Sequence, residues 1–513
     1  MAVLTKRRAV LATAVLATYQ FLHAFDPSAS FIVQIAQSLG LTNKEYYAVV
    51  APFRAWFLLP AIVVAGLTFE FLGYRASLLV LGSVLTVQEV LRALAVGLRR
   101  GHDTSLALLE AAAGVGAIAF SGGFIVNCGM FSLLPTSHYQ AASSANSIAM
   151  MVGSLVSSFA GQGLVHVLPE IGQTVYVALA LVASSVVLVL AAMAARVLPP
   201  LPNVLGPREW VRRAWRRTVF YHSSSEVLEW SAFNAVVLAT HTLVKGMWKS
   251  LFADINPAAG KLNNGLINGI TCGAAALAMI VLSLLPRATA RVARPVLCLF
   301  PLVSAAIFVG MAYAPSILVG TVLLVTYNAA SECALVMSSV MMAKSMNDAE
   351  EARISGRVKV DEASAVAAPL AGGESSSAAA PDASTYSTFS NTAINNGSSP
   401  EGEAAPAAAA AAAAPSEKVE GSAIVVSTAE GANASEPTND GAAKQKKLVD
   451  FALMFTLNSV ISILVQDLFN VVAIYVLNLN SREWFIGFAA VGCALSSCVI
   501  ASSIVKACRK SKH

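Results

Sequence analysis

The sequence predicts an all-α polytopic membrane protein with twelve transmembrane helices, arranged as two halves of six. Of its 513 residues, 56% are hydrophobic and only 12% are charged, whereas a soluble domain carries about 25% charged residues. Twelve apolar stretches are long enough to cross a bilayer, which takes about 20 mostly apolar residues. A polar connector divides them into two sets of six, the layout of a carrier built from internal repeats.

The first six predicted spans make up the N-terminal half, residues 1–197. They lie at 9–35, 46–69, 74–98, 104–133, 141–168 and 171–197. Residues 198–224 form the connector. The C-terminal half begins with four spans within 225–345, at 225–253, 262–286, 290–313 and 315–345. Its last two spans lie within 448–513, at 448–478 and 481–507, and a short tail follows them.

Residues 346–447, between spans ten and eleven, have a different composition. Eight consecutive alanines, 407–414, lie among Ser, Gly, Pro and Glu, and the only aromatic residues are Tyr386 and Phe389. Such a segment buries too little apolar surface to offset the entropy lost on ordering. We therefore expect a disordered low-complexity loop on the cytoplasmic side.

Basic residues gather in one set of loops, and this bias predicts the orientation of the chain. They precede span one (Lys6, Arg7, Arg8), fill the connector (Arg208, Arg212, Arg213, Arg216, Arg217), and lie beside spans nine, eleven and twelve. Arg99 and Arg100, between spans three and four, are the exception. We expect an integral multi-pass protein of the plasma membrane with both termini in the cytoplasm.

A short turn between spans two and three carries an acid, a glycine and an arginine. The spacing is Gly66-x-x-x-Glu70-x-x-Gly73-x-Arg75. Gly73 allows a tight turn, and Glu70 and Arg75 can pair with each other or with a helix end. The pattern resembles the signature loop of the major facilitator superfamily, which implies a gating latch. An ordinary interfacial turn with snorkelling charges is the alternative.

Further motifs resemble the reduced folate carrier and thiamine transporter family within that superfamily. Pro27-Ser-Ala-Ser-Phe31 is similar to its Pro-x-Glu-x-Phe, and Glu70-Phe-Leu-Gly-Tyr74 to its Asp-Tyr-Leu-Arg-Tyr. The others are Phe131-Ser-Leu-Leu-Pro135 with Tyr139-Gln140, Asn264-Gly265, and Ala452-Leu-Met-Phe455-x-x-Asn458. These motifs touch both halves of the chain. The resemblance implies uptake of a B-group vitamin by alternating access.

The basic residues that hold folate in this family are largely absent here. By the resemblance, its arginines and lysine fall near Gly122 or Gly123, at Ser147, at Asn328 and at Gln466. Thiamine is a cation, and its carriers use acids, aromatic residues and an amide. Glu110 and Asn264 match such positions, but Ala29 replaces an acid and Arg54 replaces an aromatic residue.

The resemblance therefore favours thiamine, with reduced folate anion exchange as the alternative. A non-transporting receptor or scaffold with a carrier fold is the second alternative, because several family positions have changed. The expected substrate-binding residues are Glu110, Asn264, Gln466, Asn328, Glu332, Arg54 and Trp56. Glu70, Gly73 and Arg75 are the expected gating residues.

Placing a polar side chain inside the bilayer costs free energy, so each further polar residue within a predicted span is a candidate functional residue. Glu89 and Arg92 lie three apart, which favours an intrahelical pair over a site. Lys245 either reaches the site or snorkels, and His241 either relays protons or is a hydrogen-bonded structural residue. Trp56 and Trp248 are candidates either for surfaces on which a substrate ring stacks or for aromatic residues at the membrane interface. On the span-eleven helix, Gln466 is expected to face the site, with Asp467 turned to packing.

The sequence contains no motif that indicates an enzyme. No nucleotide-binding Gly-x-x-x-x-Gly-Lys loop is present, and no cluster of His and Cys has the spacing of metal ligands. We expect no cofactor, no metal and no nucleic acid partner. The expected partners are a small-molecule vitamin, membrane lipid, and either a proton or a counter-anion that drives transport.

Overall fold

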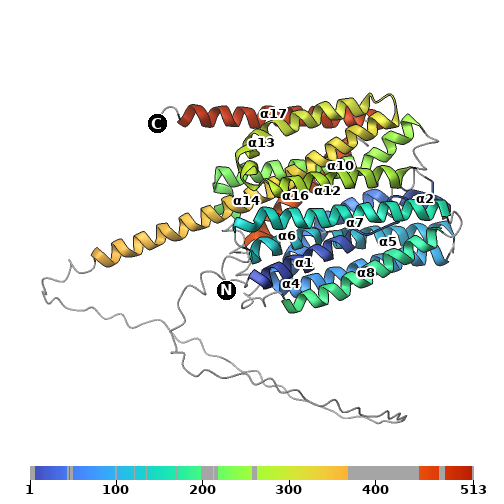
Figure 1. Ribbon diagram of the computed structural model, residues 1–513, viewed down its shortest axis with the longest axis horizontal. Helices are drawn as coiled ribbons and strands as arrows, with labels where there is room; N and C mark the ends of the chain where they lie inside the picture. The colour runs from blue at the N-terminus through green and yellow to red at the C-terminus, as the bar shows by residue number, and fades with distance from the viewer. Residues whose placement is uncertain are drawn as a thin grey trace, which may run out of the picture. The chain divides into compact units, whose positions relative to one another are not determined.

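The computed structural model describes residues 6–42, 46, 50–98, 101–120, 122–134, 136–167, 172–197, 212, 216, 218–256, 263–367, 450–472 and 480–510. Every regular element in these ranges is a helix (Figure 1), as the sequence predicts. Residues 1–355 and 439–513 together form one compact unit, and residues 356–438 form a second.

The N-terminal half supplies α1 (Lys6–His23), α2 (Ile32–Ser38), α4 (Ala51–Leu98), α5 (His102–Phe120), α6 (Gly122–Leu133), the short η2 (Thr136–His138), α7 (Tyr139–Val167) and α8 (Gly172–Val197). The C-terminal half supplies α10 (Ser225–Ile255), α12 (Asn264–Leu284), α13 (Pro286–Ala312), α14 (Ile317–Ala367), α16 (Asp450–Val471) and α17 (Ser481–Lys510). The long helices of both halves run alongside one another in Figure 1.

The helices have the length and composition of membrane spans. Within the described residues, eight helices are long and apolar enough to cross a bilayer, and three shorter apolar helices accompany them. Predicted span one is divided between two helices, α1 and α2. Predicted span four contains α5 and α6, and residue 121 between them lies outside the described residues. The chain is therefore an integral, multi-pass membrane protein.

Gly73 divides α4 into the two predicted spans on either side of the signature turn. Its φ of 74° and ψ of 177° lie outside the helical region, and the positive φ is one that glycine adopts without steric cost. The side chain of Arg75 is half-buried there. The Glu70 side chain lies outside the described residues, so the latch stays a prediction.

The tenth span extends beyond its predicted end. We expect it to end at 345, yet α14 continues as a helix to Ala367. The first part of the predicted loop 346–447 is therefore helical. Residues 368–449, which include the polyalanine run, lie outside the described residues.

Small residues bring the helices of the two halves close together. α7 packs along α12, and a Cβ added at Gly265 would lie 2.8 Å from the Ser158 carbonyl oxygen. α4 meets α16 at Gly66, where an added Cβ would lie 2.5 Å from Thr456 Oγ1. Glycines at such crossings are typical of membrane bundles, whose helices associate through close backbone contact.

Gly153→Ala tests the crossing of α1 and α7. A Cβ at Gly153 would collide with the Phe21 carbonyl oxygen, a backbone atom that cannot rotate away. We expect a loss of about 1–3 kcal/mol of unfolding free energy from this overpacking, measured by thermal unfolding in detergent. Gly163→Ala, on the same helix with nothing within 4 Å, is the control and should be neutral or stabilising. Equal stability of the two variants would contradict this packing.

Candidate substrate cavity

A cavity of about 640 Å³ lies between the two halves of the bundle. The N-terminal half contributes residues of α1, α4, α5, α6, α7 and α8, and the C-terminal half contributes residues of α10, α12, α14 and α16. The volume is typical of a small-molecule site. Its wall carries the charged residues Asp26, Glu89, Arg92, Lys245, Lys249 and Glu332.

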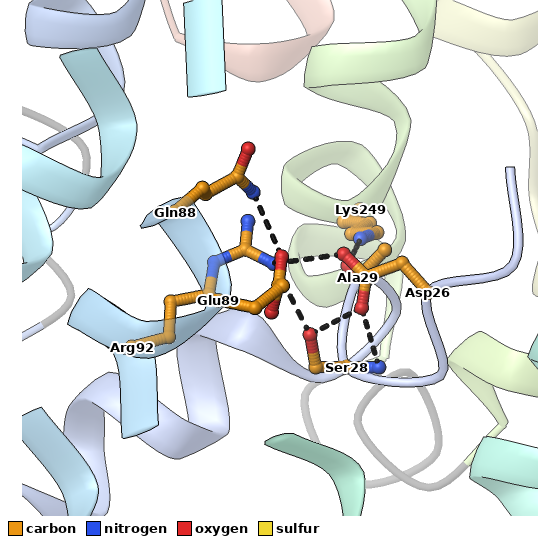
Figure 2. Close-up of polar contacts among 7 residues, drawn as sticks. All are labelled: Asp26, Ser28, Ala29, Gln88, Glu89, Arg92 and Lys249. Carbon is orange, nitrogen blue, oxygen red and sulfur yellow. Dashed lines mark hydrogen bonds and ion pairs between the residues drawn. The ribbon is translucent and has the colours of Figure 1, made fainter. Parts of the chain in front are cut away.

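Arg92 joins two acids at the N-terminal side of the wall (Figure 2). Its Nη1 lies 2.9 Å from Asp26 Oδ2 and 2.9 Å from Glu89 Oε1. Gln88 Nε2 donates a third hydrogen bond to Glu89 Oε1, at 3.0 Å. One guanidinium thus contacts both carboxyl groups.

Glu89 keeps one oxygen free within this cluster. Its side chain is 3% exposed, and Oε2 is buried with no hydrogen-bond partner among the described residues. Two further buried acceptors on the wall, Gln20 Oε1 and Asn146 Oδ1, also lack a donor there. A buried acceptor without a donor costs about 1–3 kcal/mol. The three atoms are fully buried, and their residues line the N-terminal side of the cavity together with the acid Asp26.

The break after α1 positions Asp26. The helix ends at His23, and Pro27 cannot donate to a helical hydrogen bond, so the chain turns between α1 and α2. Asp26 Oδ1 accepts hydrogen bonds from the backbone N–H of Ser28, at 3.0 Å, and from the Ser28 hydroxyl. The turn thus aims the second carboxylate oxygen at Arg92, and α1 is tied to α4.

Lys249 connects this turn to the other half of the chain. Its Nζ donates to the Ala29 carbonyl oxygen at 3.0 Å, a bond between α10 and the segment after α1 that Figure 2 shows beside Asp26. Near the C-terminal end of α7, a second contact joins the halves: Gln162 Oε1 accepts hydrogen bonds from the N–H groups of Gly265 and Leu266, at 3.1 and 3.3 Å.

At the end of the bundle where α7 begins, other contacts join the halves. Gln140 Nε2 donates to the Leu282 carbonyl oxygen at 2.8 Å, and Asn347 Nδ2 donates to the Tyr139 hydroxyl at 2.9 Å. The rings of Phe131 and Phe455 stack with their centroids 5.4 Å apart. The cavity lies between these contacts and those of Lys249 and Gln162.

A second buried group of charges lines the C-terminal side. Glu332 Oε1 lies 3.1 Å from His241 Nε2 and 3.3 Å from Lys245 Nζ. His241 Nδ1 faces the Ser331 hydroxyl at 2.8 Å. Burial of a carboxylate is costly unless it is paired, and here two basic groups of α10 provide the pairing.

The expected site residues are only partly at the cavity. Glu332 and Gln466 line it. Asn264 and Asn328 are buried outside the lining, and Asn328 Nδ2 donates to the Thr271 carbonyl oxygen at 3.4 Å. Glu110 is half-buried on α5, also outside the lining.

Of the two remaining positions, the structure describes the side chain of Trp56 alone. Trp56 is 58% exposed on α4 and does not line the cavity, which fits the alternative of an interfacial aromatic residue. The side chain of Arg54 lies outside the described residues.

Sequence reasoning did not select Asp26 or Lys249. Asp26 reaches Arg92 across 66 residues of chain, and Lys249 bonds Ala29 across 220. The available signal for Asp26 was an acid inside predicted span one, directly before a proline. The predicted intrahelical pair of Glu89 and Arg92 is confirmed, and the same pair also lines the cavity.

Solved structures resemble this chain, whereas no family model and no curated protein sequence matches it. The human organic anion transporter MFSD10 (TETRAN) is 12% identical, with 96% of this chain and 99% of that chain covered and a TM-score of 0.58. The nucleoside transporter NupG is 13% identical, with 96% and 99% covered and a TM-score of 0.51. FucP, a major facilitator superfamily transporter in the outward conformation, is 13% identical, with 67% and 88% covered and a TM-score of 0.48.

These likenesses establish the fold. The chain has the all-helical major facilitator architecture that the sequence predicts. The narrower resemblance to the reduced folate carrier and thiamine transporter family is not confirmed by the likeness to MFSD10 and NupG.

Arg92→Gln tests whether the ion pairs hold the turn after α1. The change leaves the buried Glu89 and the partly exposed Asp26 without their cation, and an unpaired buried charge costs about 3–5 kcal/mol. We expect low yield and a lower unfolding temperature, with partial recovery when Asp26→Asn is added. Arg482→Gln, at an exposed position, is the control. Wild-type stability of Arg92→Gln would contradict the role of this cluster.

Proposed function

We propose that the chain is a secondary transporter that moves a small organic solute across a membrane by alternating access. The fold supports this proposal, and so does a cavity between the two helical halves whose wall carries charged side chains in an otherwise apolar protein. Ionisable residues inside a membrane bundle are expensive to keep and typically mark a solute or ion pathway.

The contacts at the two ends of the cavity suit a bundle that opens at either end. Each end is joined by a few neutral or singly charged hydrogen bonds, such as Gln140 to Leu282 and Lys249 to Ala29. A hydrogen bond of this kind contributes about 0.5–1.5 kcal/mol net. Breaking either set therefore costs an amount that the binding of a solute can supply.

The proposed solute is a B-group vitamin, with thiamine ahead of reduced folate. The observation that carries this order is the pair of acids on the N-terminal wall of the cavity, Asp26 and Glu89, which share the single guanidinium of Arg92. Thiamine offers a cationic ring and an amino group, and the amide side chains of Gln20 and Asn146 line the same wall as the two acids. Glu89 would then fill the role of charge partner that the sequence suggested for Glu110.

Reduced folate stays the alternative because of two lysines. Lys245 and Lys249 lie one turn apart on α10, both line the cavity, and the Lys245 side chain is 44% exposed. They could receive the carboxylates of a folate in exchange for another anion. In the second alternative, a receptor or scaffold, the cavity would bind a solute without flux.

A competition assay in reconstituted vesicles distinguishes these possibilities. Labelled thiamine and labelled folinate are offered separately, and each is chased with the other unlabelled compound. We expect saturable thiamine uptake that folinate does not inhibit. Saturable folinate uptake without thiamine uptake would reverse the order, and binding without flux of either would favour the receptor.

Glu89→Gln tests the proposed charge partner. The change keeps the shape of the side chain and leaves Arg92 paired with Asp26, so the protein should fold. Loss of a partly desolvated charge contact costs about 2 kcal/mol or more, which corresponds to roughly thirty-fold or more in apparent affinity for thiamine.

Glu110→Gln is the matched control for this change, because that acid lies outside the cavity lining. It should transport thiamine with near wild-type affinity at equal surface expression. Normal affinity in Glu89→Gln together with a loss in Glu110→Gln would return the role to Glu110.

A further inference from the structure

Three arginines mark the beginning of α13. Arg287, Arg291 and Arg294 are four and three residues apart, so their positions fall on one face of the helix. Arg294 is exposed and forms no ion pair with any residue that the structure describes. The part of α13 that is apolar and long enough to cross a membrane begins at Val292. The arginines therefore lie at one end of a membrane span, at the level of the lipid headgroups.

Contacts between α13 and α17, which pack along each other, fix the register of the two helices. A Cβ added at Gly492 would lie 3.1 Å from the Pro301 carbonyl oxygen. Seven residues further along α13, the ring centroid of Phe308 lies 6.2 Å from that of Phe485, which is seven residues back along α17. The two helices are therefore antiparallel, and their positions match step for step.

The end of α17 adds basic residues at the level of the α13 arginines. Two steps of seven residues toward the start of α13 reach Arg287, and the matching steps along α17 reach Lys506. Arg509 and Lys510 follow Lys506 in the last turn of α17. Six basic residues thus gather where these two neighbouring helices end.

Few acids are available to neutralise this basic group. α13 contains no acid, and Glu483, the acid of α17, lies in its first turn, at the opposite end. α10 begins with Glu226 and Glu229, and it approaches α13 where the ring centroids of Phe233 and Phe300 lie 6.1 Å apart. Two acids therefore face six basic residues at this end, and an excess of positive charge remains.

An exposed apolar face continues from the basic group along α13. Its side chains are spaced three, four or seven residues apart, as on one side of a helix, and are 41% to 57% exposed: Val292, Leu299, Leu302, Val303 and Val309. Arg291 precedes Leu302 by about three turns, so its position lies on the same side. In a membrane this face meets acyl chains. The surface thus places positive charge at headgroup depth and an apolar strip below it.

We propose that the ends of α13 and α17 bind the headgroup of an anionic phospholipid of the surrounding bilayer, with its acyl chains along the exposed face of α13. Arginine donates paired hydrogen bonds to phosphate oxygens, and basic clusters between the ends of membrane helices suit anionic headgroups. None of these residues lines the central cavity. The lipid site is therefore separate from the proposed transport function, and its test uses no solute.

Native mass spectrometry tests this site on the full-length protein. Detergent micelles carry graded amounts of phosphatidylglycerol or phosphatidylcholine, and the spectra count the lipids that stay bound. We expect phosphatidylglycerol to bind roughly tenfold tighter or more, because of the excess positive charge. Inorganic phosphate at equal ionic strength should not displace it, because phosphate gains nothing from the apolar face. Equal affinity for the two lipids, or displacement by phosphate, overturns the proposal.

A double variant, Arg291→Gln with Arg294→Gln, tests where the lipid binds. We expect roughly thirty-fold weaker binding of phosphatidylglycerol, from about one kcal/mol for each basic residue at a membrane surface, and unchanged binding of phosphatidylcholine. Lysine at both positions should restore most of the affinity. Arg294→Gln alone, at an exposed position, should weaken binding about five-fold and serves if the double variant does not fold.

The matched control removes the same charge from the connector. Arg212 and Arg216 are exposed and helical, and they lie shortly before α10. Changing both to glutamine should leave the affinity for phosphatidylglycerol nearly unchanged. Equal losses in the two double variants would mean a diffuse attraction to positive charge and would overturn the site, as would wild-type affinity in the α13 variants.

Discussion

Burial of charge in an apolar interior is the constraint that organises this protein. Arg92 can lie within the bundle because Asp26 and Glu89 both contact it at 2.9 Å. That arrangement fixes the turn after α1, which in turn presents the Ala29 carbonyl oxygen to Lys249 of the other half. Glu332 follows the same rule with His241 and Lys245. The polar wall of the cavity is thus a set of paired charges.

Close packing around the cavity has a separate origin. Gly153 meets the Phe21 carbonyl oxygen, and Gly265 meets Ser158, so that α7 lies against α1 and α12 with backbone in contact. Helices this close leave little space of their own. The cavity is lined both by polar side chains, such as Asn146 and Asn268, and by small residues, such as Gly116 and Gly123.

Much of the fold could be predicted from sequence because span length, the turn at Gly73 and the pairing of Glu89 with Arg92 depend on local spacing. The site was harder to predict from the sequence. Asp26 meets Arg92 across 66 residues, and His241 meets Ser331 across 90, distances that no local pattern encodes. Glu110 lies at a position that resembles the family's site, but it does not line the cavity. Which face of a helix meets a cavity depends on the helices that pack around it. Helical continuation of α14 to Ala367 was also missed, because composition alone suggested disorder.

Accessibility of the cavity from the two membrane faces is the most direct test of the account. Ser147 lines the cavity on α7 and can be changed to cysteine in a background whose native cysteines are replaced by serine. Alternating access predicts that an impermeant thiol reagent labels Ser147→Cys from either face, and that saturating solute alters the ratio of the two rates. Labelling from one face alone, whether or not solute is present, would contradict transport through this cavity.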